Sequence, residues 1–440
     1  MSAVATELPH AFRPGTIRAA LSYRSFRIVF LGSTLSSVGT WMQNFILPTY
    51  LDDRTHSAAL VGALYFAQLG PMLVLSIPAG ALADRMNRTH LVMMMQGVML
   101  CLSIALGFLV GADAPLLSLF AVQLAVGTAN AIQAPAFAAS LPMMVARPDL
   151  PGAVSLLSAQ LNGSRVIGPA LAALLMASGL NLPAVFLVNS LTYVCVIVPL
   201  LFIALPQVPR PEGEASGLRA LSVGLATARR RGVVWRSLIT MCLFSIVCLP
   251  YVGLFPSVAR LNFGISSTSG TFKALYIVWG IGGFLGAVAV GTWLAHVDKR
   301  RLVRVAFAGF AVCLTAFALV SNVTGAFPVA VLLGFAYFVV TTALMSVLQQ
   351  NLATTERATV MPLWFMAFGG SVPIGNLIAG PLMDEFGARP VLIVGGVFAL
   401  VLARLFDLRR LGEHHFLPEH DGGDRFVPLD ASRRFPSRAL

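Results

Sequence analysis

Twelve apolar runs, each close to the length of a membrane-spanning helix, limit what this chain can fold into more than any other feature. A helix needs about 20 mostly apolar residues to cross a bilayer. The runs centre on residues 26–50, 58–82, 91–111, 115–139, 151–178, 183–205, 235–257, 270–295, 302–321, 325–349, 360–382 and 388–408. Only 11% of the residues are charged, whereas soluble domains average about 25%. We therefore expect an all-α integral membrane protein with twelve transmembrane helices.

The charged gaps between the runs alternate in composition. One set carries arginines and lysines, at Arg85, Arg88, Arg147, Arg229, Arg230, Arg231, Lys299, Arg300, Arg301, Arg304 and Arg357. The other set carries few basic residues, Arg54, Arg260, Lys273 and Arg389, mixed with Asp52, Asp53, Asp113, Asp384 and Glu385. Basic gaps mark the cytoplasmic side of a membrane protein. The pattern predicts that both termini are cytoplasmic and that the chain lies in a cell inner membrane.

The longest polar gap divides the runs six and six. We expect a cytoplasmic N-terminal segment (1–25), an N-terminal six-helix bundle (26–205), a cytoplasmic linker (206–234), a C-terminal six-helix bundle (235–409) and a disordered cytoplasmic tail (410–440). Within the linker, residues 217–230 favour a short amphipathic helix on the anionic membrane surface. The N-terminus has no apolar core before a cleavage site, so we expect no cleaved signal peptide.

The two halves of the chain resemble each other. When the fifth and eleventh runs are aligned without gaps, Gly168 falls on Gly375 and Pro183 falls on Pro390. The charged break at 80–91 is echoed by the break at 291–302. Repeats of this kind predict two pseudo-symmetric bundles that share a site at their interface and rock about it.

The break at 80–91, GALADRMNRTHL, has a pattern that resembles the loop between the second and third helices of the major facilitator superfamily. Gly80, Asp84, Arg85 and Arg88 carry the match, and Arg300 lies in the second copy. Gly80 is expected to let a neighbouring helix approach closely, and Asp84 and Arg88 attract each other if that turn is helical. The resemblance implies a latch that joins the two halves on the cytoplasmic side and favours an outward-open state.

Within that superfamily, residues 20–408 resemble the branch called transmembrane secretion effectors, which includes the enterobactin exporter. The match is carried by FRIVFLGSTLSSVGTWMQ, by QAPAFAASLPMMVARPDLPGAVSLLSAQLNGSRVIGPALA and by LQQNLATTERATVMPLWFMAFGGSVPIGNLIAG. The branch has R-G-R-V after its tenth helix, and this chain departs from it after Arg357, where Ala358 and Thr359 follow. Arg357 is the gating candidate in this loop.

Gly168 and Pro169 resemble the antiporter signature of the superfamily, G-x-x-x-G-P-x-x-G-G. Proline removes a backbone donor and glycine lets a partner helix approach, so the pair is expected to bend the fifth helix. The resemblance favours export over uptake.

Arg165 is the only arginine or lysine that we predict deep inside a span. A charge at that depth must face a wet cavity or a partner, and the acid within the predicted spans, Asp407, lies at the end of the last run. Two interpretations stay open: Arg165 clamps helices together, or it binds an anionic substrate group. The other candidates for the substrate cavity are polar or aromatic residues within spans, namely Gln43, Gln123, Asn130, Tyr276, Trp279 and Trp364.

Proton coupling is expected from the resemblance, and the carboxylates that remain as candidates are Asp52 and Asp53, at the outer end of the first helix.

The sequence thus predicts a secondary active transporter that exports amphiphilic small molecules by alternating access, coupled to a proton counter-ion. Two alternatives stay open: uptake of a metabolite, and a non-transporting sensor or scaffold with a transporter fold. We expect no enzymatic activity, because no nucleophile with a base, paired acids or metal set lies at depth. The expected partners are the lipid bilayer and a small-molecule substrate. We expect a monomer with no cofactor, no metal site and no nucleic-acid partner.

Overall fold

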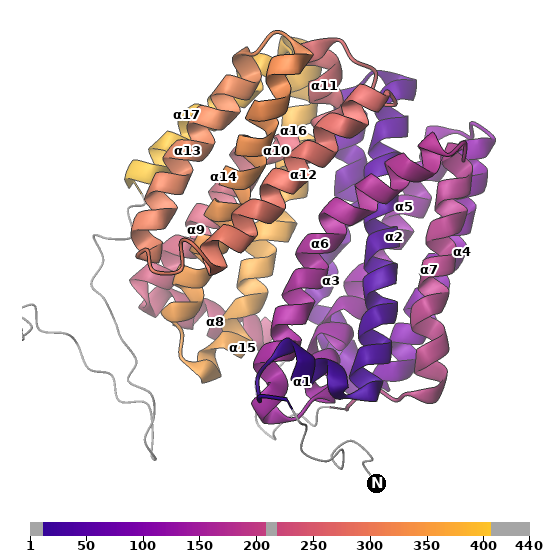
Figure 1. Ribbon diagram of the computed structural model, residues 1–440, viewed down its shortest axis with the longest axis vertical. Coiled ribbons are helices and arrows are strands. Elements are labelled where there is room, and N and C mark those ends of the chain that lie inside the picture. The colour runs from indigo at the N-terminus through magenta and orange to yellow at the C-terminus, as the bar shows by residue number, and fades with distance from the viewer. Residues whose placement is uncertain (1–11, 208–217, 406–440) are drawn as a thin grey trace, which may run out of the picture.

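The computed structural model describes residues 12–207 and 218–405, and these residues form helices and connections without a strand. The N-terminal bundle consists of α2 (Arg24–Thr55), α3 (Ala58–Arg85), α4 (Arg88–Gly111), α5 (Leu116–Ser140), α6 (Leu150–Ala177) and α7 (Leu182–Phe202). The C-terminal bundle consists of α9 (Gly232–Val247), α10 (Pro250–Gly253), α11 (Phe255–Phe263), α12 (Gly270–Gly291), α13 (Lys299–Leu319), α14 (Val323–Gln350), α15 (Thr354–Phe365), α16 (Ser371–Phe386) and α17 (Ala388–Leu405). The two bundles lie side by side (Figure 1).

The all-α membrane fold that the sequence predicts is confirmed. In the described part of the chain, eight helices are long and apolar enough on their own to cross a bilayer. The architecture is consistent with twelve spans. One of the eight is the column formed by α15 and α16, and the other four are α2, α6, α17 and the interrupted column α9–α11. The predicted tail, 410–440, lies outside the described residues.

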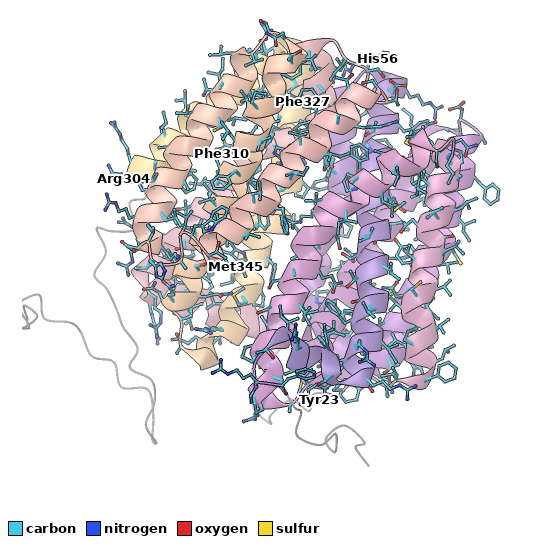
Figure 2. All side chains as sticks on the ribbon, viewed as in Figure 1. Tyr23, His56, Arg304, Phe310, Phe327 and Met345 are labelled. Carbon is cyan, nitrogen blue, oxygen red and sulfur yellow. The ribbon has the colours of Figure 1, made fainter. Side chains whose placement is uncertain are left out.

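The two ends of the molecule differ and need names. Helices α1 (Ile17–Ser22) and α8 (Leu218–Arg230) lie at one end, here called the α8 end, and α11 lies at the other, called the α11 end (Figure 1). Tyr23 and His56, on either side of α2, mark these two ends in Figure 2. The basic gaps of the sequence all fall at the α8 end, and the gaps richer in acids fall at the α11 end.

Polar side chains cap the starts of two helices that follow the charged breaks in the sequence. Asn87 accepts hydrogen bonds from the backbone N–H groups of Thr89 and His90, which caps α4. Asp298 caps α13 in the same way through the Arg300 N–H. In the ungapped alignment of 80–91 with 291–302, Asn87 falls on Asp298, so the internal repeat extends to the caps. Such caps satisfy donors that a helix start leaves open.

The first break is not helical throughout, which was the condition for an attraction between Asp84 and Arg88 along one helix. Asp84 and Arg88 are not four residues apart on a single helix, because α3 ends at Arg85 and α4 begins at Arg88 after a non-helical turn. The side chains of Asp84 and Arg85 lie outside the described part of the structure.

Two of the columns are interrupted, which the apolar runs did not predict. The run at 235–257 breaks at Leu249, because Pro250 has no N–H to continue the helical ladder. The run at 360–382 contains a π-helical turn, Met366–Gly370, between α15 and α16. Turns of this kind are frequent at functional sites.

The hydrophobic core shows where the bundles meet. One cluster of buried side chains runs through the C-terminal bundle and continues into the α11 half of the N-terminal bundle, through residues such as Phe45 and Val61. A second cluster, with Phe26, Leu91 and Tyr193, occupies the α8 half of the N-terminal bundle. The core is therefore shared between bundles in the α11 half and separate in the α8 half.

Close contact of α3 with α16 forms the seam between the bundles. A Cβ added at Gly380 would lie 2.6 Å from the Ala58 carbonyl oxygen, and one added at Gly62 would strike the Asn376 carbonyl. Glycine permits this backbone approach. Farther along, Gly370 packs on the Leu73 side chain. Beyond Leu73, a Cβ at Gly80 would meet none of the described atoms within 4 Å, so the close approach expected at Gly80 is absent from the described part of this arrangement.

Two short helices, α1 and α8, pack at the α8 end. The predicted linker helix is present as α8, and it packs on α15 through Gly224, which lies against the Thr359 carbonyl. Helix α1 was not predicted. It is held to the start of α6 because the Gly15 N–H and the Tyr23 hydroxyl both donate to Asp149, each at 2.9 Å.

The arrangement predicts which loops share a face of the membrane. Met86→Cys and Val297→Cys, both partly exposed at the α8 end, are expected to react with an impermeant maleimide from one side. Ser178→Cys, at the α11 end, is expected to react only from the opposite side. The parent protein, measured in parallel, gives the background from its five native cysteines. Labelling of positions 86 and 297 from opposite sides would contradict the fold.

Candidate functional site

A buried carboxylate joins the two bundles at the α11 end. Asp52, on α2, is completely buried. It accepts hydrogen bonds from the Arg260 guanidinium at 3.0 and 3.1 Å. The hydroxyls of Ser257 and Ser267 donate to it at 2.6 and 2.8 Å. All four donors come from the C-terminal bundle. Its neighbour Asp53 is exposed and accepts from Ser266 at 2.8 Å.

A second carboxylate makes the reciprocal connection. Asp384, on α16 of the C-terminal bundle, accepts from the Ser57 hydroxyl at 2.8 Å and from the backbone N–H groups of Ala58 and Ala59 at 2.7 and 2.9 Å. These groups form the N-terminus of α3. Open N–H groups and the helix dipole favour a negative charge at that position. Asp384 therefore caps a helix of the opposite bundle.

The name terminal clasp is used here for Asp52, Asp384 and their partners Arg260, Ser257, Ser267 and Ser57. A buried pair of this type is a weak source of net stability, because desolvation offsets most of the attraction. Removal of one partner is costly, at about 3–5 kcal/mol, since it leaves a charge buried without compensation. The clasp therefore suits a contact that must be specific when closed and must still be able to open.

At mid-depth the interface is aromatic and carries one cation. The Arg165 guanidinium, on α6, lies 5.2 Å from the ring centre of Trp41 on α2 and 5.9 Å from that of Phe338 on α14. Toward the α11 end, Phe45 of the N-terminal bundle packs on Tyr276, with ring centres 4.7 Å apart. Tyr276 in turn packs on Trp279 at 5.4 Å. Three of the predicted cavity residues, Arg165, Tyr276 and Trp279, thus lie together at the bundle interface.

The other predicted cavity residues lie elsewhere. Gln43 is buried inside the N-terminal bundle, where its carbonyl oxygen accepts from Asn189 at 2.8 Å and from Ser103 at 3.2 Å. Gln123 is buried on α5, and Trp364 belongs to the core of the C-terminal bundle. Asn130 is exposed on α5. These residues were predicted to line the cavity because they are polar or aromatic and lie within a span. The direction in which each side chain faces depends on helix packing, which one apolar run does not show.

Helix α6 fits tightly on α2 next to Arg165. A Cβ at Gly168 would lie 2.6 Å from the Trp41 Cβ and 2.8 Å from the Val38 carbonyl oxygen. Pro169 lies inside α6, which continues as a helix to Ala177. The glycine thus allows the close packing that the sequence suggested, and this packing holds Trp41 beside Arg165.

Arg300 and Arg357, two gating candidates at the α8 end, each make a contact within the C-terminal bundle. Arg300 donates to the Asn351 side chain at 3.3 Å, at the end of α14. Arg357 donates to the Gln349 carbonyl at 3.2 Å. Nearby, Arg231 pairs with Glu356 at 2.9 Å, while Glu356 also accepts from the Ala353 N–H at the start of α15. Arg88 is buried at the start of α4.

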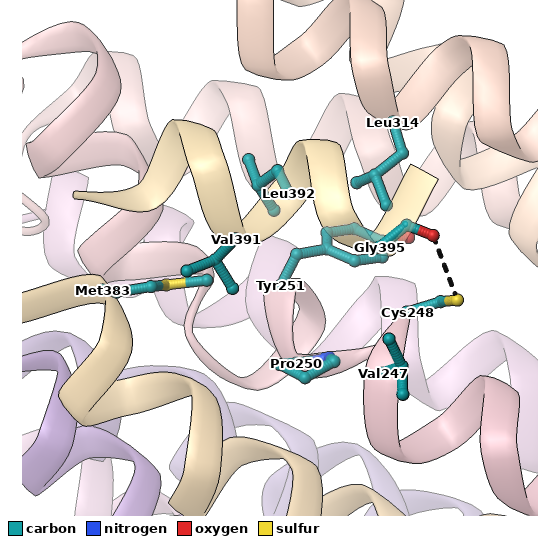
Figure 3. A pocket seen from close by; sticks show the side chains of 9 residues that line it. All are labelled: Val247, Cys248, Pro250, Tyr251, Leu314, Met383, Val391, Leu392 and Gly395. Carbon is teal, nitrogen blue, oxygen red and sulfur yellow. Dashed lines mark hydrogen bonds between the residues drawn. The ribbon is translucent and has the colours of Figure 1, made fainter. Parts of the chain in front are cut away.

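A small gap lies within the C-terminal bundle, at the break between α9 and α10. Val247, Cys248, Pro250, Tyr251, Leu314, Met383, Val391, Leu392 and Gly395 line it (Figure 3). The Cys248 thiol donates to the Gly395 carbonyl at 3.2 Å. The gap has essentially no room for even a water molecule, whereas small-molecule pockets measure about 300–1,000 Å³. The gap is a packing defect beside a broken helix and does not match a substrate site.

Comparison with known proteins agrees with this architecture. The family model described as transmembrane secretion effector matches residues 16–421. The chain belongs to this family. It is a branch of the major facilitator superfamily.

Curated relatives share about a quarter of their residues with the chain along nearly their whole length. The staphyloferrin A transporter of Staphylococcus aureus is 25% identical over 395 residues, which cover 87% of this chain and 94% of that protein. The enterobactin exporter of Escherichia coli O1:K1 is 27% identical over 416 residues, covering 88% and 94%. The family and these relatives are transporters.

Solved structures share the fold at low identity. A variant of a nucleoside transporter aligns with a TM-score of 0.72 and 12% identity, covering 87% of this chain and 99% of that one. A bacterial homologue of the iron transporter ferroportin aligns with a TM-score of 0.64 and 17% identity, covering 88% and 98%.

The loop pattern at 80–91 predicted a contact between the bundles at the α8 end, and no pattern predicted the terminal clasp at the α11 end. The sequence predicted Asp52 as a coupling candidate but not its contact with the other bundle, and it showed Arg260 and Asp384 only as charges in gaps. Their partners are more than 200 residues away along the chain. One signal for these contacts was present in the sequence: acids and arginines occur together in the gaps that fall at the α11 end.

Arg260→Gln is expected to weaken the terminal clasp. Asp52 keeps its two serine donors, so we expect a cost near the lower end of the range for buried pairs, about 3 kcal/mol. The fully buried Val61→Cys, one turn from Ala58 on α3, reports opening through its rate of alkylation. Alkylation is expected to be at least tenfold faster in the Arg260→Gln background.

Asp53→Asn is the matched control, because it changes an adjacent but exposed carboxylate. Its alkylation rate should stay within about twofold of the parent. Equal rates in the Arg260→Gln and parent backgrounds would show that the clasp does not hold the bundles together.

Proposed function

We propose that this protein exports small amphiphilic molecules across the inner membrane by alternating access. The observation that carries the proposal is the division of the bundle interface into two halves. The core is shared in the α11 half and separate in the α8 half. Two rigid bundles joined at one end, by contacts that can open, have the geometry required for rocking around a central site.

The direction of transport rests on which end faces the cytoplasm. The α8 end carries the basic connections, and basic residues beside spans favour the cytoplasmic side. With that orientation the described arrangement is closed toward the outside. Both termini then lie in the cytoplasm. Export means that the substrate enters from the α8 half and leaves after the terminal clasp opens.

The relatives support a narrower proposal for the cargo. One is named as a transporter of staphyloferrin A and another as an exporter of enterobactin. We propose that the substrate of this chain is of the same general kind: a polar, metal-chelating or amphiphilic metabolite. The protein lies in the lipid bilayer, and we propose that it acts as a monomer without a cofactor.

Proton antiport is the proposed source of energy, with Asp52 as the coupling group and Asp53 as an accessory. When the clasp opens, Asp52 must part from Arg260 and meet water at the α11 end. A carboxylate that has lost its ion-pair partner binds a proton more readily. Protonation at that position would prevent re-formation of the ion pair and so link the proton to the state of the gate.

Uptake and a non-transporting sensor are the two alternatives. We expect cells that produce the protein to accumulate less of an amphiphilic fluorescent dye than cells without it, by about twofold or more. Greater accumulation would support uptake. Unchanged accumulation of several dyes of different charge would favour the sensor.

Asp52→Asn and Asp53→Asn test the coupling. In proteoliposomes with an imposed proton gradient, Asp52→Asn is expected to reduce gradient-driven transport at least tenfold. It should leave the slow exchange of substrate without a gradient within about threefold. Asp53→Asn is expected to have a smaller effect. If the double Asn variant still transports at the parental gradient-driven rate, neither residue couples the proton.

A further inference from the structure

Arg165 has an environment that its packing alone does not explain. It lies near the middle of α6, and it is only half-buried. Its contacts come from both bundles: Trp41 on one side and Phe338 on the other. Tyr276 of the C-terminal bundle is near enough to interact with its charge, and the Tyr337 hydroxyl is also a hydrogen-bonding partner of the guanidinium. The Nε–H is buried and has no hydrogen-bond acceptor.

The charge of Arg165 is not balanced by the protein at this depth. Every acidic residue between positions 12 and 405 lies in a connection or within about one turn of a helix end. The ion pairs traced through the described residues, Asp52–Arg260 and Arg231–Glu356, lie toward opposite ends of the molecule. An isolated cation at the middle of a membrane is costly unless water or a counter-ion reaches it.

The position along the interface completes the geometry. The seam between α3 and α16 can be followed from the α11 end to Leu73 and Gly370, which are also near mid-helix. Arg165 lies at a corresponding depth, next to the Val166–Gly280 contact between α6 and α12. It therefore stands where the shared core ends and the separate α8 half begins.

We propose that Arg165 is the anion-binding residue of the transport site and that it selects substrates with a carboxylate or another planar anion next to an aromatic group. This inference rests on the proposed export function and adds its substrate class. The guanidinium presents a planar array of N–H donors, including the open Nε–H, that matches a carboxylate in bidentate geometry. The faces of Trp41 and Phe338 orient the guanidinium plane and offer an apolar surface to the rest of the ligand.

A purely structural role for Arg165 would be to hold α6 against α14 through the ring of Phe338. Such cation–π contacts contribute about 0.5–2 kcal/mol. That role needs no free N–H donor and does not depend on the charge of a ligand. The two roles therefore differ in what happens to a neutral ligand when Arg165 is replaced.

The test uses a pair of probes of almost equal shape, 2-naphthoate and 2-naphthamide, of which only the first is charged at neutral pH. Binding to the purified full-length protein in phosphatidylcholine nanodiscs is followed by quenching of tryptophan fluorescence, because Trp41 adjoins the site. The variants are Arg165→Gln, which removes the charge, and Arg165→Lys, which keeps it without the planar fork. Glu385→Gln, which changes an exposed carboxylate at the α11 end, serves as a control variant remote from the site.

We expect the parent protein to bind 2-naphthoate at least tenfold more tightly than 2-naphthamide. Arg165→Gln should reduce this ratio to about one while leaving the affinity for 2-naphthamide within about twofold. Arg165→Lys should retain an intermediate preference, and Glu385→Gln the full preference. A parent protein without the preference would overturn the proposal, and so would an equal loss of both probes in Arg165→Gln. If Arg165→Gln does not fold, the ratio in Arg165→Lys decides, because a value unchanged from the parent contradicts the bidentate site.

An anionic lipid headgroup has the same chemistry and would compete for the site. Nanodiscs containing phosphatidylglycerol distinguish the two sources. Unchanged affinity for 2-naphthoate assigns the site to a soluble ligand, and a tenfold loss that requires Arg165 assigns it to the lipid. These binding measurements do not depend on transport, so failure of the dye assay would remove the export function without deciding the anion site.

Discussion

The structure depends on a polar contact across an otherwise apolar interface: the buried carboxylate of Asp52 and its four donors in the opposite bundle. Apolar packing alone does not fix one arrangement of two bundles in lipid, because the lipid tails are as apolar as the side chains. Ion pairs and helix caps are directional. Asp52 and Asp384 therefore select the closed arrangement of the α11 end, and their modest net stability leaves it able to open.

The remainder of the interface follows from that closed end. Glycines bring α3 and α16 into backbone contact near the clasp, and the contact weakens toward mid-helix. Aromatic rings from both bundles fill the next layer. Below them Arg165 is the first charged group, with ring faces on two sides and no acid at its depth. The interface thus passes from a polar clasp through a packed aromatic layer to a cationic site.

The fold could be predicted from the sequence because lipid imposes a length and a hydropathy on every span. The caps at Asn87 and Asp298 and the amphipathic α8 left local signals as well. The break at Leu249 follows from Pro250, a local signal that was overlooked, and the π-helical turn at Met366–Gly370 was not predicted. For the site, Asp52 and Arg165 were identified by their chemistry. The direction of Gln43 was not predictable, since a run of apolar residues does not define which face meets the other bundle.

Distances measured across the two ends of the same protein test this account most directly. Spin labels at Thr55 and Glu385 report on the α11 end, and labels at Met86 and Arg357 report on the α8 end. We expect a short distance at the α11 end with a long distance at the α8 end, and a second population, induced by substrate or low pH, in which the two are reversed. Single distances that never change, or that lengthen together at both ends, would contradict it.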